Sequence, residues 1–173
     1  MGQASRRAEP DDLYVWGSTT KMFTAAAMLQ LVDRGLVKPS DPAAQHVDPA
    51  LQHLNGTTLR RHFGSWIGRV TIEHLLHMTS GIGDYDGEAF SVSQGLEPGH
   101  GDRTRDFDPG TIVLEYVPRQ PMFEPGTRQM YCSSNYILLG LALLTHLHGD
   151  AADWSWRDYN QMSVAGGMPE LQR

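Results

Sequence analysis

The chain has 173 residues, of which 14 are lysine or arginine and 20 are aspartate or glutamate, so its formal charge is −6 at pH 7 with histidine neutral. This sign argues against a nucleic-acid binder, because contacts with phosphates need a basic face. Hydrophobic residues make up 40% of the chain, enough for one packed globular domain. The single cysteine, Cys132, excludes an intramolecular disulfide and therefore a disulfide-stapled secreted scaffold.

Residues 1–12 are predicted to form a polar tail and residues 13–173 a domain. The tail lacks the apolar run of an export signal. The longest apolar stretch, 136–144, is far shorter than the ~20 residues that span a bilayer. We therefore expect a soluble chain without a membrane span, cytoplasmic by default.

The first predicted elements are a short extended stretch over 13–16 and a helix that ends at Gly35, with Ser18 or Thr19 as its N-cap or first-turn residue. Apolar residues that recur at steps of three and four predict its buried stripe. These residues are Met22, Phe23, Ala26, Leu29 and Val32.

The middle of the chain is predicted to be irregular apart from one helix. Residues 39–56 are rich in proline, histidine and glutamine, which indicates loops and short turns without a catalytic role. Thr71 is expected to cap a packing helix that ends before Gly81. Residues 81–110 contain many glycines and aspartates, so we expect a long irregular segment with short helical turns.

The last third predicts a turn over 125–127 and a strongly apolar, deeply buried helix from Asn135 or Tyr136 to Gly149. An aromatic cluster follows this helix, and clusters in that position more often pack than bind a ligand. Its members are Trp154, Trp156 and Tyr159.

Ser18 and Lys21 form the pattern that carries chemistry. Positions i and i+3 at the start of a helix share one face, so the hydroxyl and the amine can touch. A serine hydroxyl becomes a nucleophile when a neighbour takes its proton, and a lysine serves if its pKa falls below ~10.4. The Ser18 N–H could also donate to an oxyanion. A capping serine beside a solvated lysine is the ordinary alternative.

Three blocks of sequence resemble the serine β-lactamase and penicillin-binding-protein-related family, in particular its class C, D-peptidase and esterase branches. They cover residues 17–36, 70–82 and 123–140, in the family's order. The resemblance implies an α+β fold of the β-lactamase/transpeptidase type, of which this chain covers the mostly α-helical half with most of the sheet missing. It also implies a serine hydrolase that forms an acyl-enzyme, with Ser18 as nucleophile and Lys21 as proton acceptor.

The implied substrate is a small molecule or peptide, such as a β-lactam, a D-amino-acid peptide or an ester, and no metal or organic cofactor is implied. In the class C and esterase branches a Tyr-x-Asn motif follows Pro-Gly-Thr after three residues. That spacing falls on Tyr131, the implied second base coupled to Lys21, and on Ser133, which replaces the substrate-binding asparagine. Reading residues 133–135 as a Ser-x-Asn motif is the alternative register, which the spacing disfavours.

One family motif is absent. The strand that faces the nucleophile carries Lys or His, then Thr or Ser, then Gly, and no such tripeptide occurs among the 173 residues. We therefore expect a truncated domain with uncovered apolar helix faces and poor hydrolysis, since losing one oxyanion donor costs about 10²–10³ in rate. The alternative is a catalytically impaired remnant or binding module of the same family.

The remaining candidates are interpreted as structural. Residues 146–150 have a His-x-His-x-Asp spacing typical of zinc sites, but histidines that contact last-turn carbonyls of a helix are the simpler explanation. Cys132 is expected to be a small buried residue rather than a catalytic thiol. The sequence does not predict an oligomeric state.

Overall fold

The computed structural model describes residues 7–12, 14, 17–93, 106–149 and 151–158. These residues are mostly helical and contain no strand, only one isolated bridge between Pro42 and Thr71. The prediction of a mostly α-helical chain is thus confirmed. Of the extended stretch predicted over 13–16, only Tyr14 is described, and its side chain is exposed. No helix in the described part is both long and apolar enough to cross a membrane.

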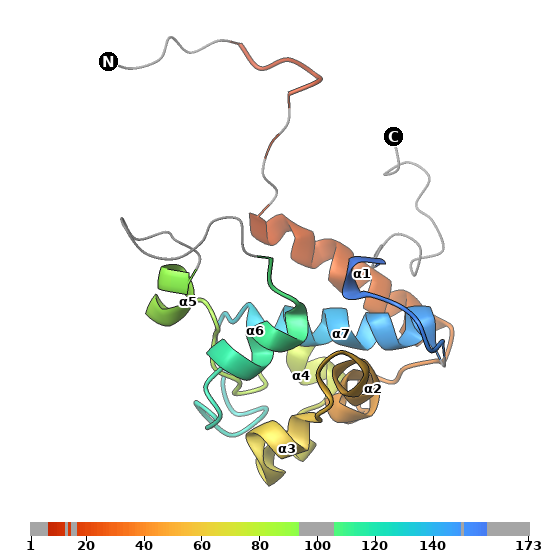
Figure 1. Ribbon diagram of the computed structural model, residues 1–173, viewed down its shortest axis with the longest axis vertical. Helices are drawn as coiled ribbons and strands as arrows, with labels where there is room; N and C mark the ends of the chain where they lie inside the picture. Colours follow the sequence, from red (N-terminus) through yellow and green to blue (C-terminus); the bar gives the residue numbers. More distant parts are fainter. Residues whose placement is uncertain (1–6, 13, 15–16, 94–105, 150, 159–173) are drawn as a thin grey trace.

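The helices and 3₁₀ turns follow one another along the chain (Figure 1). In order they are η1 (Gly17–Thr19), α1 (Thr20–Asp33), α2 (Ala43–Asn55), α3 (Leu59–Phe63), η2 (Ser65–Arg69), α4 (Ile72–Leu76), α5 (Glu88–Ser93), α6 (Pro109–Tyr116), α7 (Ser134–His148) and η3 (Trp156–Asp158).

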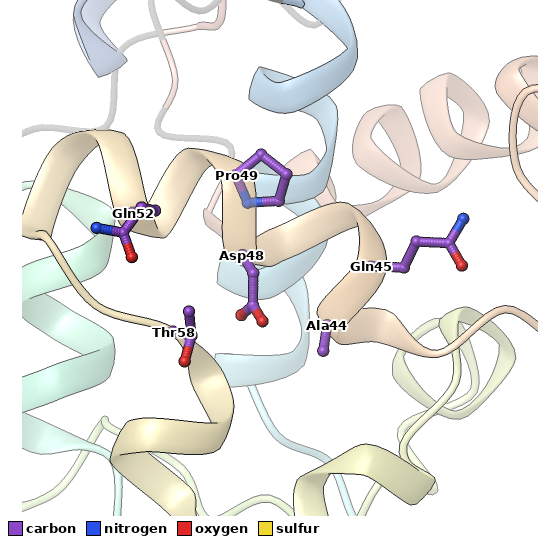
Figure 2. Close-up of a pocket in the computed structure, with 6 residues that line it drawn as sticks. All are labelled: Ala44, Gln45, Asp48, Pro49, Gln52 and Thr58. Atoms are coloured by element: carbon purple, nitrogen blue, oxygen red, sulfur yellow. The ribbon is translucent and has the colours of Figure 1, made fainter.

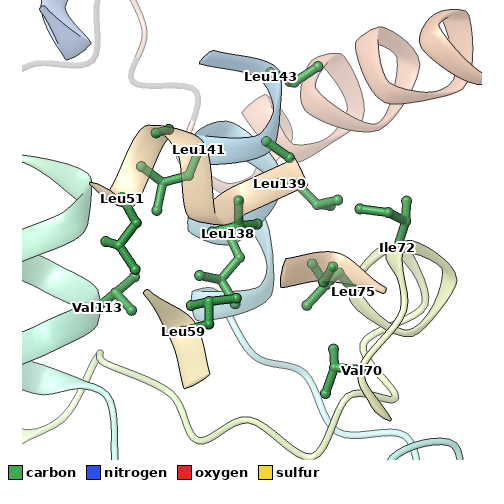
Figure 3. Packing of buried hydrophobic residues seen from close by; sticks show 14 of the residues in the cluster. Leu51, Leu59, Val70, Ile72, Leu75, Val113, Leu138, Leu139, Leu141 and Leu143 are labelled. Carbon is green, nitrogen blue, oxygen red and sulfur yellow. The ribbon is translucent and has the colours of Figure 1, made fainter. Parts of the chain in front are cut away.

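Helix α7 is the centre of the fold, as Figure 1 shows, and contacts α1, α2, α4 and α6. It is the buried helix that the sequence predicts, and it ends at Gly149 as expected. Its leucines meet Leu51, Leu59, Leu75 and Val113 in one cluster (Figure 3). Because burial of each such side chain contributes about 1.5–3 kcal/mol, this cluster is the main source of stability.

Helix α2 contradicts the prediction of loops over 39–56. Ala43, Val47 and Ala50 are fully buried at helical spacing, and this periodicity outweighs the proline at position 49. Pro49 lacks the N–H that would bond to the Gln45 carbonyl, but both residues are exposed, so water can satisfy that carbonyl. Both line a shallow groove on the outer face of α2 (Figure 2).

The predicted buried stripe of α1 is wrong. The residues of α1 that are buried are Thr24, Ala27, Met28 and Leu31. Met22 and Leu29, by contrast, are 63% and 51% exposed. Alanine, methionine and leucine occur all around this helix, so the apolar pattern does not select one face; the contact with α7 does. The exposed pair agrees with the expectation of uncovered apolar helix faces.

The segment 81–110 is less irregular than predicted. It contains α5 and the beginning of α6, while residues 94–105 lie outside the described ranges. Asp108 accepts a hydrogen bond from the Thr111 N–H at 2.8 Å, and Pro109 occupies the first turn of α6. This Asp-Pro pair is a typical helix start that the sequence interpretation missed.

The start of α4 is the capped end that Thr71 predicts. The Thr71 hydroxyl accepts from the His74 N–H at 3.2 Å, and His74 Nδ1 accepts from the Thr71 N–H at 3.3 Å. This reciprocal pair is a capping box. Helix α4 ends at Leu76, earlier than expected, because the backbone turns at Met78 with a φ of 56°.

The loop after α4 holds the segment that leads into α7. Hydrogen bonds join the Met122 N–H to the Gly81 carbonyl at 2.8 Å and the Met130 N–H to the Met78 carbonyl at 3.1 Å. Between them, the Thr127 N–H bonds to the Glu124 carbonyl at 3.1 Å and Gly126 has a φ of 82°, which confirms the predicted turn.

Gly81→Ala is expected to destabilise the fold more than Gly35→Ala, although both glycines have a positive φ, 77° and 71°. A Cβ at Gly81 would lie 2.0 Å from the Phe123 carbonyl oxygen, whereas one at Gly35 meets no atom within 4 Å. Gly35→Ala should cost about 1–2 kcal/mol from backbone strain alone, and Gly81→Ala about 1–3 kcal/mol more from the clash. Urea unfolding followed by circular dichroism measures the free energy of unfolding of both variants. Equal losses would contradict the close approach of Gly81 to the Phe123 carbonyl oxygen.

Candidate active site

Ser18 lies in the 3₁₀ turn that precedes α1. Gly17 enters the turn with a φ of 52°, and the Thr20 hydroxyl donates to the Gly17 carbonyl at 2.9 Å. The helix therefore begins at Thr20, and Thr19, at the capping position, forms no side-chain capping bond. Thr19 thus occupies the predicted N-cap position without a side-chain capping bond, and the Thr20 hydroxyl closes the turn instead. Ser18 is exposed, with its hydroxyl free of a capping role.

The side chains of Ser18, Lys21 and Tyr131 meet at one point. Lys21 Nζ donates to Ser18 Oγ at 3.1 Å, and Ser18 Oγ lies 2.6 Å from Tyr131 Oη. The serine and the tyrosine are 113 positions apart in the chain, so tertiary packing brings them together. Tyr131 is 58% exposed, which leaves the serine open to a ligand from solvent.

Electrostatics at this site lower the pKa of the Tyr131 phenol. The hydrogen bond from Lys21 is the largest cause that lowers the pKa of the Tyr131 phenol, followed by the bond with Ser18. The Ser133 hydroxyl lowers this pKa further, and burial opposes it. The serine hydroxyl therefore lies between the Lys21 amine and the Tyr131 phenol.

The segment 132–134 is fastened to the loop after α4, and this fixes Tyr131. The buried Cys132 thiol donates to the Ile82 carbonyl at 3.3 Å, and burial raises the pKa of this thiol. Asp84 accepts from the Ser133 N–H at 3.0 Å, and the Tyr85 N–H donates to Ser134 Oγ at 2.9 Å. Cys132 is thus the small buried residue that the sequence predicts.

Asn135 does not reach Ser18. It is 1% exposed and bonds to the Ser80 hydroxyl and, through its amide nitrogen, to the Cys132 carbonyl at 3.2 Å. The Asn135 amide is therefore engaged within the core and not beside Ser18. Ser133, the predicted substrate-binding residue, is half-buried at the start of α7.

The histidines near the end of α7 contact other side chains rather than last-turn carbonyls. His146 Nε2 lies 3.0 Å from Nδ1 of His46, and His148 stacks on Trp154 with ring centroids 4.6 Å apart. Burial, together with His46, lowers the pKa of His146. Asp150 of the proposed zinc spacing lies outside the described ranges. Within those ranges no three His, Cys, Asp or Glu residues are grouped so that they could hold a metal.

The tryptophans after α7 pack against the core, as the sequence predicts. Trp154 and Trp156 are partly buried against it, while Tyr159, the third aromatic of that cluster, is outside the described ranges. Trp154 also stacks on His53 with ring centroids 4.1 Å apart. These aromatics therefore join α2 and the end of α7.

The sequence interpretation missed two residues that support the site. Asp84 holds the N–H of Ser133, and Tyr136 places its ring 5.9 Å from Lys21 Nζ. Asp84 follows Gly-Ile-Gly, where an aspartate resembles any polar loop residue. Tyr136 falls in the apolar pattern of α7, which signals packing alone.

Three comparisons place this geometry among known proteins. The β-lactamase family model matches residues 1–149. "Protein flp" of Staphylococcus aureus (strain N315) is 27% identical over 137 residues, which cover 79% of this chain and 24% of that protein. This chain therefore spans about a quarter of the length of the curated relatives it matches.

Solved structures share the fold. A D-stereospecific amidohydrolase from Streptomyces sp. has a TM-score of 0.63 at 23% identity, covering 88% of this chain and 39% of that one. The octameric penicillin-binding protein homologue from Pyrococcus abyssi has a TM-score of 0.56 at 26% identity, covering 87% of this chain and 29% of that one. These likenesses confirm the predicted fold class.

Proposed function

The chain belongs to the β-lactamase family, whose model matches residues 1–149, and from this premise we propose that it is a serine hydrolase that forms an acyl-enzyme on Ser18. The observation that carries the proposal is the contact of Ser18 Oγ with Tyr131 Oη at 2.6 Å and with Lys21 Nζ at 3.1 Å. A hydroxyl that lies between a cation and a group able to take its proton is an arrangement that suits nucleophilic catalysis.

In the proposed mechanism, the proton of Ser18 moves to the Lys21–Tyr131 pair while Oγ attacks the carbonyl carbon of the substrate. With lysine as ammonium and tyrosine as phenolate, the pair accepts the proton on Tyr131 Oη, and the lowered pKa of Tyr131 supports this arrangement. The leaving amine or alcohol then takes the proton as its bond to the carbonyl breaks. Water repeats the steps to release the acid and restore Ser18.

The proposed substrate is an amide or ester: a β-lactam, a D-amino-acid peptide or an ester. Ser133, whose hydroxyl contributes to the lowered pKa of Tyr131, is the proposed substrate-binding residue. A second candidate, an impaired remnant or binding module of the family, is favoured by one observation: Ser133 stands where the family motif has a substrate-binding asparagine.

Covalent labelling tests the proposal. We expect a fluorophosphonate or a penicillin to add its mass to the peptide that contains Ser18, in the folded chain and not after heat unfolding. Tandem mass spectrometry locates the adduct, and the neighbouring Ser133 and Ser134 serve as internal controls. Adducts spread over several serines, or equal labelling of the unfolded chain, would refute a built nucleophile. A folded chain that acquires no adduct at Ser18 would favour the binding module.

Labelling is expected to become faster as the pH rises through the pKa of Tyr131. This pKa lies below its ordinary value of ~10. The phenol is protonated and inactive as a base below the folded-state pKa, and ionised above it. Tyr131→Phe should slow labelling by about 10²–10⁴-fold and remove this rise. Rate constants measured over pH for both chains provide the check; an unchanged profile in Tyr131→Phe would exclude Tyr131 as the base.

A further inference from the structure

Lys21 is half-buried among hydroxyl groups and aromatic rings. Its Nζ lies 5.1 Å from the ring centroid of Tyr131 and 5.9 Å from that of Tyr136. The ion pairs found among the described residues all involve other side chains, so within that part of the chain Lys21 has no carboxylate partner. The partners of its positive charge are therefore the two tyrosines, since an ammonium within about 6 Å of a ring face is attracted to it.

Tyr136 is held rigidly in place. It lies in the first turn of α7, half-buried, and its hydroxyl donates to the Leu76 carbonyl at 3.2 Å. Leu76 is the last residue of α4, where a helix carbonyl lacks an intrahelical donor, so this bond satisfies the helix end, while packing against the core holds the ring. Burial, followed by the nearby Tyr131, raises the pKa of Tyr136, which therefore stays a neutral phenol.

We infer that Tyr136 is a positioning residue whose fixed ring holds the Lys21 ammonium within hydrogen-bond reach of Ser18. This inference rests on the proposed function, because it gives Tyr136 a role in readying the Ser18 nucleophile. Tyr136 acts through Lys21: its hydroxyl is committed to Leu76 and is not offered to a substrate. The three residues come from η1, α1 and α7, so the ring also links α7 to the start of α1.

The position of Lys21 can be measured through the pKa of Tyr131, which depends on the groups that face its phenol. They are Lys21 from α1, Ser18 from η1, Ser133 at the start of α7, Tyr136 within it, and Tyr85 in the loop after α4, whose pKa Tyr131 helps to raise. Lys21 makes the largest contribution to the lowered pKa of Tyr131. If Lys21 loses its position, the pKa of Tyr131 must rise, and the pH at which labelling accelerates must rise with it.

The experiment compares Tyr136→Leu, which removes the ring, with Tyr136→Phe, which keeps the ring and removes only the hydroxyl. Tyr136→Leu should slow fluorophosphonate labelling by about 2- to 30-fold and move its rising limb to higher pH. Tyr136→Phe should stay close to the parent in both. Tyr116→Leu is the matched control, because Tyr116 is a half-buried tyrosine that packs on Phe90 and Phe107 instead. If Tyr136→Leu does not fold, Tyr136→Met takes its place.

A second readout does not depend on activity. Tyrosinate absorbance is titrated for each chain and for its Tyr131→Phe counterpart, and the difference isolates Tyr131. An upward shift of this titration in Tyr136→Leu alone supports the inference, even if no probe labels the chain and the proposed function fails. If Tyr136→Leu is labelled at Ser18 and matches the parent in both its titration and its labelling profile, the inference is overturned. The proposed function then still stands. A shift of equal size in Tyr116→Leu also overturns it.

Discussion

Replacing Ser18 by alanine is expected to reduce acylation and turnover to background. In a fully built serine hydrolase, removal of the nucleophile costs up to about 10⁶-fold, because the remaining groups that act with it have nothing left to activate. Ser18 is exposed and forms no helix cap, so its loss should leave the fold intact. Initial rates with ester and β-lactam substrates, measured alongside intact-protein mass after a penicillin, report both steps.

Thr19→Ala is the matched control for this substitution. Thr19 carries the neighbouring hydroxyl, is also exposed, and makes no capping bond, so its removal tests whether any nearby hydroxyl matters. We expect Thr19→Ala to keep parental labelling. If Ser18→Ala and Thr19→Ala both turn over substrate at the parental rate, the nucleophile lies outside this turn and its assignment to Ser18 is wrong.

The fold could be predicted from the sequence where one signal was unambiguous. Helix α7 combines dense leucine spacing with a terminal glycine, and the cap at Thr71 uses local chemistry, so both follow from short stretches of chain. The prediction misses helix α2, because the proline, histidine and glutamine of this stretch are typical of loops, whereas its buried period consists of small residues, alanines and a valine. The buried face of α1 could not be predicted at all, because its apolar residues surround the helix and only the contact with α7 chooses a side.

The candidate site also contains residues that the sequence predicts and residues that it does not. Ser18 and Lys21 are neighbours by helical spacing, and the distance of Tyr131 from its Pro-Gly-Thr turn matches a family motif. Asp84 and Tyr136 act through tertiary contacts, with Ser133 and Lys21 respectively, and nothing in their local sequence separates them from ordinary loop and core residues. Groups that touch the reacting atoms thus leave a motif, whereas groups that orient them depend on the whole fold.

Lys21→Met is expected to slow acylation by about 10²–10⁴-fold, the range for loss of a general acid or base. The effect has two parts, since the amine donates to Ser18 Oγ and is also the largest cause of the lowered pKa of Tyr131. Without the cation, this pKa should return toward its ordinary value, and the residual rate should rise only at higher pH. Lys21→Arg keeps the cation, so it should preserve part of the shift while losing most of the rate through altered geometry at Ser18.

Lys38→Met is the control that the chain itself offers, because Lys21 and Lys38 are its only lysines. Lys38 is exposed, and its neighbour Asp41 is bound through the backbone N–H of Lys38 rather than its amine. We therefore expect parental rates and an unchanged pH profile from Lys38→Met. Rate–pH curves for the three variants and the parent separate these roles. If Lys21→Met labels slowly but its rate rises at the parental pH, Lys21 acts on Ser18 without lowering the pKa of Tyr131. The proposed coupling of Lys21 with Tyr131 would then be wrong.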